Sequence, residues 1–140
     1  MPDSAVYEEM SRGDCIALLH TTSVGRVGGV VDGRPFVLPV NYAVDGDRVV
    51  FRTSPGTKLT GAAFGRVAFE VDSFDPARRS GWSVVIEGVA SDISDMVDEL
   101  SVKLRHLELQ PWPPGDKSHW VAILAESVTG RRVRASAPTD

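Results

Sequence analysis

Two tight turns in quick succession constrain this chain more than any other feature of its sequence. The first, Asp32-Gly33, divides the apolar run 25–31 from the run 35–44. The second, Asp45-Gly46-Asp47, divides that run from the strand-like segment 49–52. An Asp-Gly pair between apolar runs is typical of a β-hairpin, because both central turn positions need a positive φ that aspartate and glycine tolerate. Three consecutive antiparallel strands are therefore expected in the N-terminal half.

The rest of the chain is expected to add three strands and two to three short helices. Apolar runs predict strands over 67–71, 81–93 and 119–125. Apolar residues at helical spacing, each group preceded by a serine that can cap a helix, predict helices over 11–19 and 94–107. A third helix is expected over 57–64, and the polar segment 73–80 is expected to be a loop.

The expected fold class is mainly β (α+β), a small antiparallel barrel or an α+β roll. Barrel closure is favoured because it leaves no strand edge exposed. The 140 residues have the length of one domain, assigned to residues 1–134, and residues 135–140 are expected to form a loose tail. The net charge of -4 argues against nucleic acid as a partner. No apolar run is long enough to span a membrane, and a cytoplasmic location is expected.

No catalytic constellation stands out among the polar residues. The three histidines, His20, His106 and His119, do not have the spacing of metal ligands, so no metal site is expected. The single cysteine, Cys15, lies among apolar residues and is expected to be a packed thiol. A chain without an evident acid, base or nucleophile either is not an enzyme or takes its chemistry from a cofactor.

The segment FRTSPGTKL, residues 51–59, is the strongest candidate for a binding site. It places Arg52 and Thr53 at a strand end, a Ser-Pro-Gly turn after them, and Thr57 and Lys58 at an expected helix start. Backbone N–H groups at a turn, hydroxyls and a fixed positive charge are what phosphate binding requires. The alternative is an ordinary strand-turn-helix joint, in which Thr57 caps the helix and Lys58 is solvated.

Two longer segments resemble the FMN-binding split-barrel family, the relatives of pyridoxamine 5'-phosphate oxidase, and in particular its short single-domain bacterial members. They are VGRVGGVVDGRPFVLPVNYAVDGDRVVFRTSPGTKL and GWSVVIEGVA, and the resemblance covers roughly residues 11–132. It implies a six-stranded antiparallel split β-barrel that forms a homodimer, with FMN at the interface. The implied cofactor-binding residues are Pro39, Val40, Asn41 and Tyr42 along the flavin ring, Arg52, Thr53, Thr57 and Lys58 at the phosphate end, and Trp82 and Ser83 beside the flavin.

The resemblance also implies that the C-terminal region contacts the flavin of the second subunit. The residues concerned are His119, Trp120 and the stretch 129–132 with Arg131, for which a solvated basic segment is the alternative. The Arg-x-His ending of the vitamin oxidases is absent, and Arg52 stands where nitroimidazole reductases carry histidine. The implied function is a flavin-dependent oxidoreductase acting on a small-molecule redox substrate, with a deazaflavin as a possible cofactor. The alternatives are a non-enzymatic flavin- or tetrapyrrole-binding module and a dimeric scaffold that has lost its cofactor.

Overall fold

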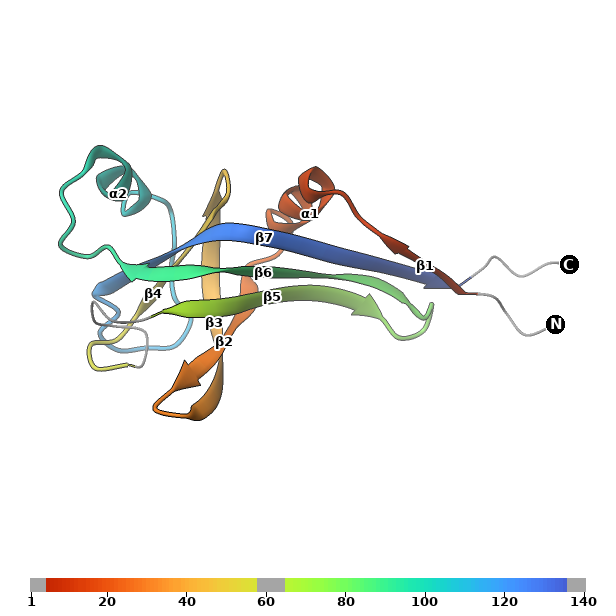
Figure 1. Ribbon diagram of the computed structural model, residues 1–140, viewed down its shortest axis with the longest axis horizontal. Helices are drawn as coiled ribbons and strands as arrows, with labels where there is room; N and C mark the ends of the chain where they lie inside the picture. The colour runs from red at the N-terminus through yellow and green to blue at the C-terminus, as the bar shows by residue number, and fades with distance from the viewer. Residues whose placement is uncertain (1–4, 58–64, 136–140) are drawn as a thin grey trace, which may run out of the picture.

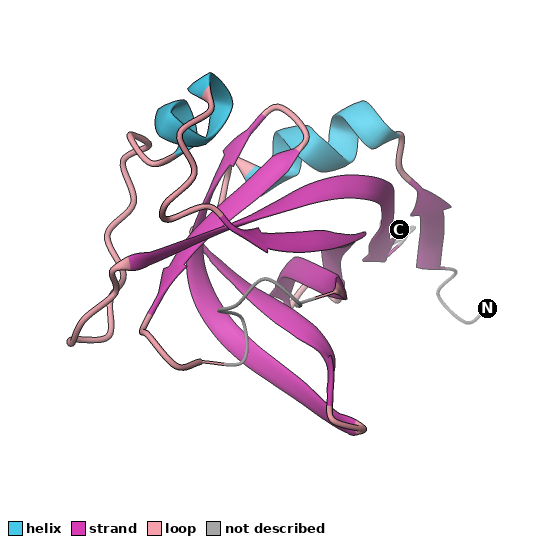
Figure 2. Ribbon diagram, turned by 60° about the vertical axis from the view of Figure 1, so that its left-hand side comes forward, coloured by secondary structure: helices cyan, strands magenta, loops and turns pink. Residues whose placement is uncertain are grey.

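The computed structural model of the chain describes residues 5–57 and 65–135, which fold into one antiparallel sheet with two helices. Figure 1 shows the sheet curling on itself, and Figure 2 shows both helices on one side of it. In chain order the elements are β1 (Ala5–Glu9), α1 (Arg12–Leu19), β2 (Val24–Val31), β3 (Arg34–Asp45), β4 (Arg48–Thr53), β5 (Arg66–Asp75), β6 (Ser80–Asp92), α2 (Glu99–Leu104) and β7 (His119–Ala135).

The sheet closes into a barrel of six strands. Its strand order is β1-β7-β4-β3-β2-β5-β6, and an additional pairing of β6 with β7 joins the two ends of the run from β7 to β6. The N-terminal half of β7 lies between β4 and β6, and its C-terminal half lies between β1 and β6. Within the described residues, the prediction of a mainly β antiparallel barrel is confirmed, and β1 is a seventh strand that the sequence analysis missed.

Both predicted hairpin turns have the backbone conformation that their residues favour. Asp32 and Gly33 have φ values of 52° and 75°, which are the positive values of a type I′ turn. Gly46 has a φ of 61° between the paired residues Asp45 and Arg48. The turn after β4 also follows the expectation, because Gly56 has a φ of 79° and the Thr57 N–H donates to the Ser54 carbonyl over 3.4 Å. The local sequence therefore determines where β4 begins and the turn that follows it.

The apolar faces of the strands pack inside the barrel. Phe51, Phe69, Ile86 and Ile123 are fully buried there, together with neighbouring valines of β2, β5 and β6. A smaller cluster contains Val50, Ile93, Leu104, Leu109 and Ala122, and it joins α2 and the segment after it to β4, β7 and the residue that follows β6. The segment that follows α2 is thereby held close to the end of β4.

The predicted loop over 73–80 is too long, because only residues 76–79 form the turn, and the predicted last strand is too short. Residues 73–75 continue β5 and pair with 80–82 of β6, so that a two-stranded arm extends where the sequence is polar. Gly81 permits this close pairing, because a Cβ at that position would lie 2.4 Å from the Ser73 carbonyl oxygen. Strand β7 likewise continues past residue 125 through the arginine-rich stretch and includes Ala135, the first residue of the predicted tail.

The second helix, α2, is shorter than predicted. The N-cap of α2 is Asp98, whose carboxylate accepts the Ser101 N–H, and not Ser94. Ser94 instead donates its hydroxyl to Asp92, and its oxygen accepts the Trp120 N–H. The helix α1 begins as predicted, since Ser11 accepts the Asp14 N–H. The helix predicted over 57–64 lies almost entirely outside the described residues.

Candidate functional site

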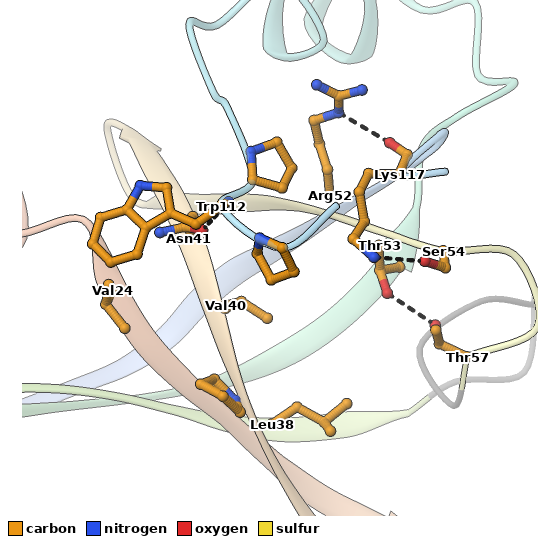
Figure 3. A pocket seen from close by; sticks show the side chains of 13 residues that line it. Val24, Leu38, Val40, Asn41, Arg52, Thr53, Ser54, Thr57, Trp112 and Lys117 are labelled. Atoms are coloured by element: carbon orange, nitrogen blue, oxygen red, sulfur yellow. Dashed lines mark hydrogen bonds between the residues drawn. The ribbon is translucent and has the colours of Figure 1, made fainter. Parts of the chain in front are cut away.

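A pocket of about 410 Å³ lies beside strands β3 and β4, and most of the segment FRTSPGT borders it. Its floor is apolar, with Leu38 and Val40 of β3 between the two ends of the pocket (Figure 3). The full set of lining residues is Val24, Leu38, Pro39, Val40, Asn41, Arg52, Thr53, Ser54, Thr57, Pro111, Trp112, Pro113 and Lys117.

Hydroxyls and an ammonium group gather at one end of this pocket. The Lys117 ammonium donates to the Ser54 hydroxyl oxygen over 2.8 Å, and the Thr53 hydroxyl donates to that of Thr57 over 3.2 Å (Figure 3). These are the donor types that hold phosphate oxygens. The end of β4 and the turn after it supply the hydroxyls, and the segment before β7 supplies the charge.

Arg52 points away from this polar end (Figure 3). Its guanidinium donates to the Lys117 carbonyl over 3.0 Å and to the Leu109 carbonyl over 3.2 Å. The guanidinium carbon also lies 5.0 Å from the centre of the Trp120 ring, which is a cation–π contact. Arg52 therefore fixes both ends of the segment 109–117, which is one wall of the pocket.

The opposite end of the pocket is bordered by Trp112 and Asn41. The Asn41 side-chain oxygen accepts the backbone N–H of Trp112 over 2.8 Å, and its amide nitrogen donates to the Ser23 carbonyl over 3.2 Å. Trp112 stands in a proline-rich stretch and has 72% of its surface exposed, although large aromatic side chains are usually buried. This end presents an aromatic face next to an apolar floor.

Tyr42 follows Asn41 in the chain but faces the barrel interior. Its side chain is buried, with its ring edge against Phe69 and its hydroxyl 2.6 Å from both the Leu19 carbonyl and the Thr22 hydroxyl. Burial raises the pKa of the Tyr42 phenol, and the hydrogen bond with Thr22 lowers it by less. Within this chain, Tyr42 anchors β3 to the end of α1.

Four other residues that the resemblance assigns to the cofactor do not line this pocket. Trp82 packs against the core and Ser83 pairs across the sheet with Arg131. Arg131 forms an ion pair of 3.3 Å with Glu9 of β1, and Trp120 lies against the Arg52 guanidinium. The structure thus brings together Pro39, Val40, Asn41, Arg52, Thr53 and Thr57. Lys58 lies outside the described residues.

Sequence reasoning missed Lys117 and Trp112. Both lie in a segment that looks irregular, and their distance from β4 in the chain gives no sign of contact. The pairing of Thr53 with His119 is what carries Lys117 to the end of β4. The available signals were the rarity of lysine, which occurs only at positions 58, 103 and 117, and a tryptophan between prolines.

A second polar group lies at the start of β7. His119 Nδ1 is 2.7 Å from an Asp92 carboxylate oxygen, and the other carboxylate oxygen accepts the N–H and hydroxyl of Ser94. Burial acts to raise the pKa of Asp92, but the hydrogen bonds from Ser94 and His119 bring it below its usual value. Neither His119 nor Asp92 borders the pocket, and no group of three or more potential metal ligands occurs in the described parts of the chain.

No helix among the described residues is long and apolar enough to cross a membrane. The expectation of a cytoplasmic location stays a prediction.

Comparisons with known proteins agree on one family. The family model for pyridoxamine 5'-phosphate oxidase matches residues 11–132. An uncharacterized protein of Mycobacterium tuberculosis is 36% identical over 137 residues, which are 94% of this chain and 88% of that protein. Two similar solved structures are an FAD-binding protein from Mycobacterium smegmatis (36% identity, TM-score 0.75, 92% of this chain and 98% of that one) and one from Mesorhizobium loti (27% identity, TM-score 0.72, 91% and 98%).

Proposed function

Because this chain belongs to the pyridoxamine 5'-phosphate oxidase family, we propose that its pocket binds a flavin and that the protein is a flavin-dependent oxidoreductase. The observation that carries this proposal is the convergence of six residues that the resemblance assigns to the cofactor. Residues of β3, of β4 and of the turn after β4 border the same pocket, and β3 and β4 are the two strands of one hairpin.

The pocket suits a flavin nucleotide in both its chemistry and its size. A flavin nucleotide joins a planar, largely apolar ring to an anionic phosphate through a polar chain. The pocket has an apolar floor, an aromatic side chain at one end and hydroxyls with an ammonium group at the other. Its volume of about 410 Å³ is within the usual range of ligand pockets.

The residues of the site would orient the cofactor, while the bound flavin would supply the redox chemistry by exchanging electrons with a small organic substrate. Leu38 and Val40 would exclude water from one face of the ring. Thr53, Ser54 and Thr57 would hold the phosphate end, together with Lys58, which the resemblance assigns to it. FMN is the cofactor that we propose first, and FAD follows it because the two solved relatives are FAD-binding proteins.

We further propose a homodimer in which the second subunit completes each flavin site. Four of the residues assigned to the cofactor that do not line the pocket, Trp82, Ser83, Trp120 and Arg131, would then act in the partner's site. The β2–β3 hairpin leaves Val30 and Val37 66% and 68% exposed, although both are apolar. Exposed apolar side chains on a projecting hairpin suit burial against a second copy.

The test is an absorbance spectrum of the purified protein, followed by mass identification of any chromophore released on denaturation. Titrations of the apoprotein with FMN, FAD, riboflavin and a deazaflavin then rank the cofactors. We expect flavin absorbance or micromolar or tighter binding of at least one flavin nucleotide. Failure to bind any of these compounds would refute the proposal.

The enzymatic part of the proposal needs its own measurement. The flavin-loaded protein should oxidise a reduced nicotinamide or pass electrons to a small acceptor over many cycles. A bound flavin that no donor or acceptor can oxidise or reduce would instead identify a flavin-binding module without activity.

A further inference from the structure

We infer that Lys117 binds the phosphate oxygens of the flavin nucleotide, an inference that rests on the proposed function of the pocket. The phosphate group concerned is the monoester of FMN or the pyrophosphate of FAD. Two cationic side chains border the pocket within the described residues, Arg52 and Lys117. The Arg52 guanidinium is directed at two backbone carbonyls, whereas the Lys117 ammonium lies among the hydroxyls.

The hydrogen bonding of this end leaves donors for an anion. An ammonium group has three N–H donors, and one of those of Lys117 is directed at the Ser54 oxygen. Since Ser54 accepts this bond, its own hydroxyl hydrogen is available to donate. Two N–H groups and one O–H group can therefore point at the same phosphate.

No carboxylate competes for the Lys117 charge in the described part of the chain. No Asp or Glu borders the pocket, and none forms an ion pair with Lys117. The adjacent Asp116 accepts the Ser118 N–H over 3.0 Å. Lys103, by comparison, forms an ion pair of 3.2 Å with Asp45 on another part of the surface. Within the described residues, no carboxylate therefore neutralises the Lys117 ammonium, and its charge can interact with an anionic ligand.

The backbone on the C-terminal side of Lys117 is held by hydrogen bonds. Its carbonyl accepts the Arg52 Nε–H, and residue 119 is already paired with Thr53 in the sheet. A cation held in position loses less conformational freedom on binding than one on a mobile loop. Lys117 would thus bind in a position set by the barrel itself.

The experiment compares Lys117→Gln with the wild type and with Lys103→Gln, which makes the same change of charge away from the pocket. Glutamine has a neutral side chain that still carries N–H donors, so the substitution removes the charge and keeps a polar donor at this position. Affinities for FMN, FAD and riboflavin are measured by quenching of flavin fluorescence at low and high salt. Riboflavin has the same ring and no phosphate, so it reports on the ring site alone.

We expect Lys117→Gln to weaken binding of FMN, FAD or both by about tenfold or more, because a charge-assisted hydrogen bond is lost. Riboflavin affinity should change less than about threefold, and Lys103→Gln should match the wild type. Lys117→Arg should restore most of the affinity. Whichever nucleotide loses affinity identifies the phosphate group that Lys117 contacts. The loss should shrink at high salt, which screens charge interactions.

Equal losses for riboflavin and for both nucleotides, or no loss, would overturn the inference while leaving flavin binding intact. A wild-type protein that binds none of the three would refute the proposed function itself and the inference with it. Should Lys117→Gln fail to fold, amine-reactive labelling of the wild type tests the inference instead. A nucleotide but not riboflavin should then protect Lys117 from the label, and equal labelling with every flavin would overturn the inference.

Discussion

Removal of the Arg52 side chain is expected to destabilise the protein even when no flavin is present. Its guanidinium makes hydrogen bonds to the carbonyls of Leu109 and Lys117 and a cation–π contact with Trp120. Hydrogen bonds that involve a charged group contribute roughly 1.5–3 kcal/mol each, and a cation–π contact roughly 0.5–1 kcal/mol at an exposed site. Because Arg52 is partly exposed and such contributions are not additive, Arg52→Ala should cost about 2–4 kcal/mol.

The assay is urea denaturation of the apoprotein, followed by tryptophan fluorescence. The midpoint for Arg52→Ala should fall with little change in slope, and Tm should fall by roughly 6–15 °C for a domain of this length. Arg52→Lys should lose about half as much stability, since one ammonium group cannot reach both carbonyls in the fork geometry of arginine. Arg66→Ala is the control, because that arginine makes a surface ion pair with Glu126 that is worth little.

One outcome would refute this reasoning about Arg52. If Arg52→Ala unfolded within about 0.5 kcal/mol of the wild type but bound FMN far more weakly than riboflavin, the guanidinium would be a phosphate ligand. The resemblance alone predicts that result. The geometry predicts that Arg52→Ala lowers the stability of the apoprotein. Any loss of flavin affinity should then be equal for FMN and riboflavin, because the wall of the pocket formed by 109–117 has moved.

Three further predictions concern other parts of the molecule. Burial and the neighbouring Asp72 raise the pKa of Glu70 to about 7 despite Arg26, so the folded state favours the protonated carboxyl and loses stability as pH rises from 4.5 to 7. In urea titrations, the free energy of unfolding of Glu70→Gln should rise relative to that of the wild type by up to about 1 kcal/mol between pH 4.5 and 7. A difference in unfolding free energy that stays the same at every pH would contradict this. Tyr42→Phe should cost about 1–2 kcal/mol in the same assay, and an unchanged midpoint would show that its bonds to Leu19 and Thr22 contribute nothing. Sedimentation should give about twice the chain mass of 15.1 kDa at micromolar concentration, and a monomer would contradict the proposed homodimer.

The fold could be predicted where local sequence determines the backbone. Asp32-Gly33 specifies its own turn, and this tight turn sets the register of the two apolar runs that it joins. The polar ends of β5 and β7 could not be predicted in this way. Their side chains lie beyond the closed barrel, and their pairing is stabilised by backbone hydrogen bonds that leave no apolar pattern.

The site was predictable only in part for a related reason. Asn41, Arg52 and Thr53 could be placed in one site because their hairpin and its resemblance to known proteins lie in one continuous segment. The side-chain contacts of Asn41 and Arg52 could not be predicted, because they are made with the distant segment 109–117. A sequence pattern identifies which residues border a site more readily than it identifies which atoms they face.

The position of β7 has a consequence for how the chain folds. This last strand closes the barrel by joining β4 to β6, and its final residue pairs with the first strand, Ala135 with Ala5. Closure by β4 and β7, like the pairing of β1 with β7, therefore requires contacts between residues far apart in the chain, which makes folding slow relative to that of local structures. During synthesis, β4 and β6 remain open edges until the last strand has left the ribosome, and open edges favour pairing with other chains. The growing chain is thus most prone to aggregate just before β7 emerges and pairs with β4 and β6.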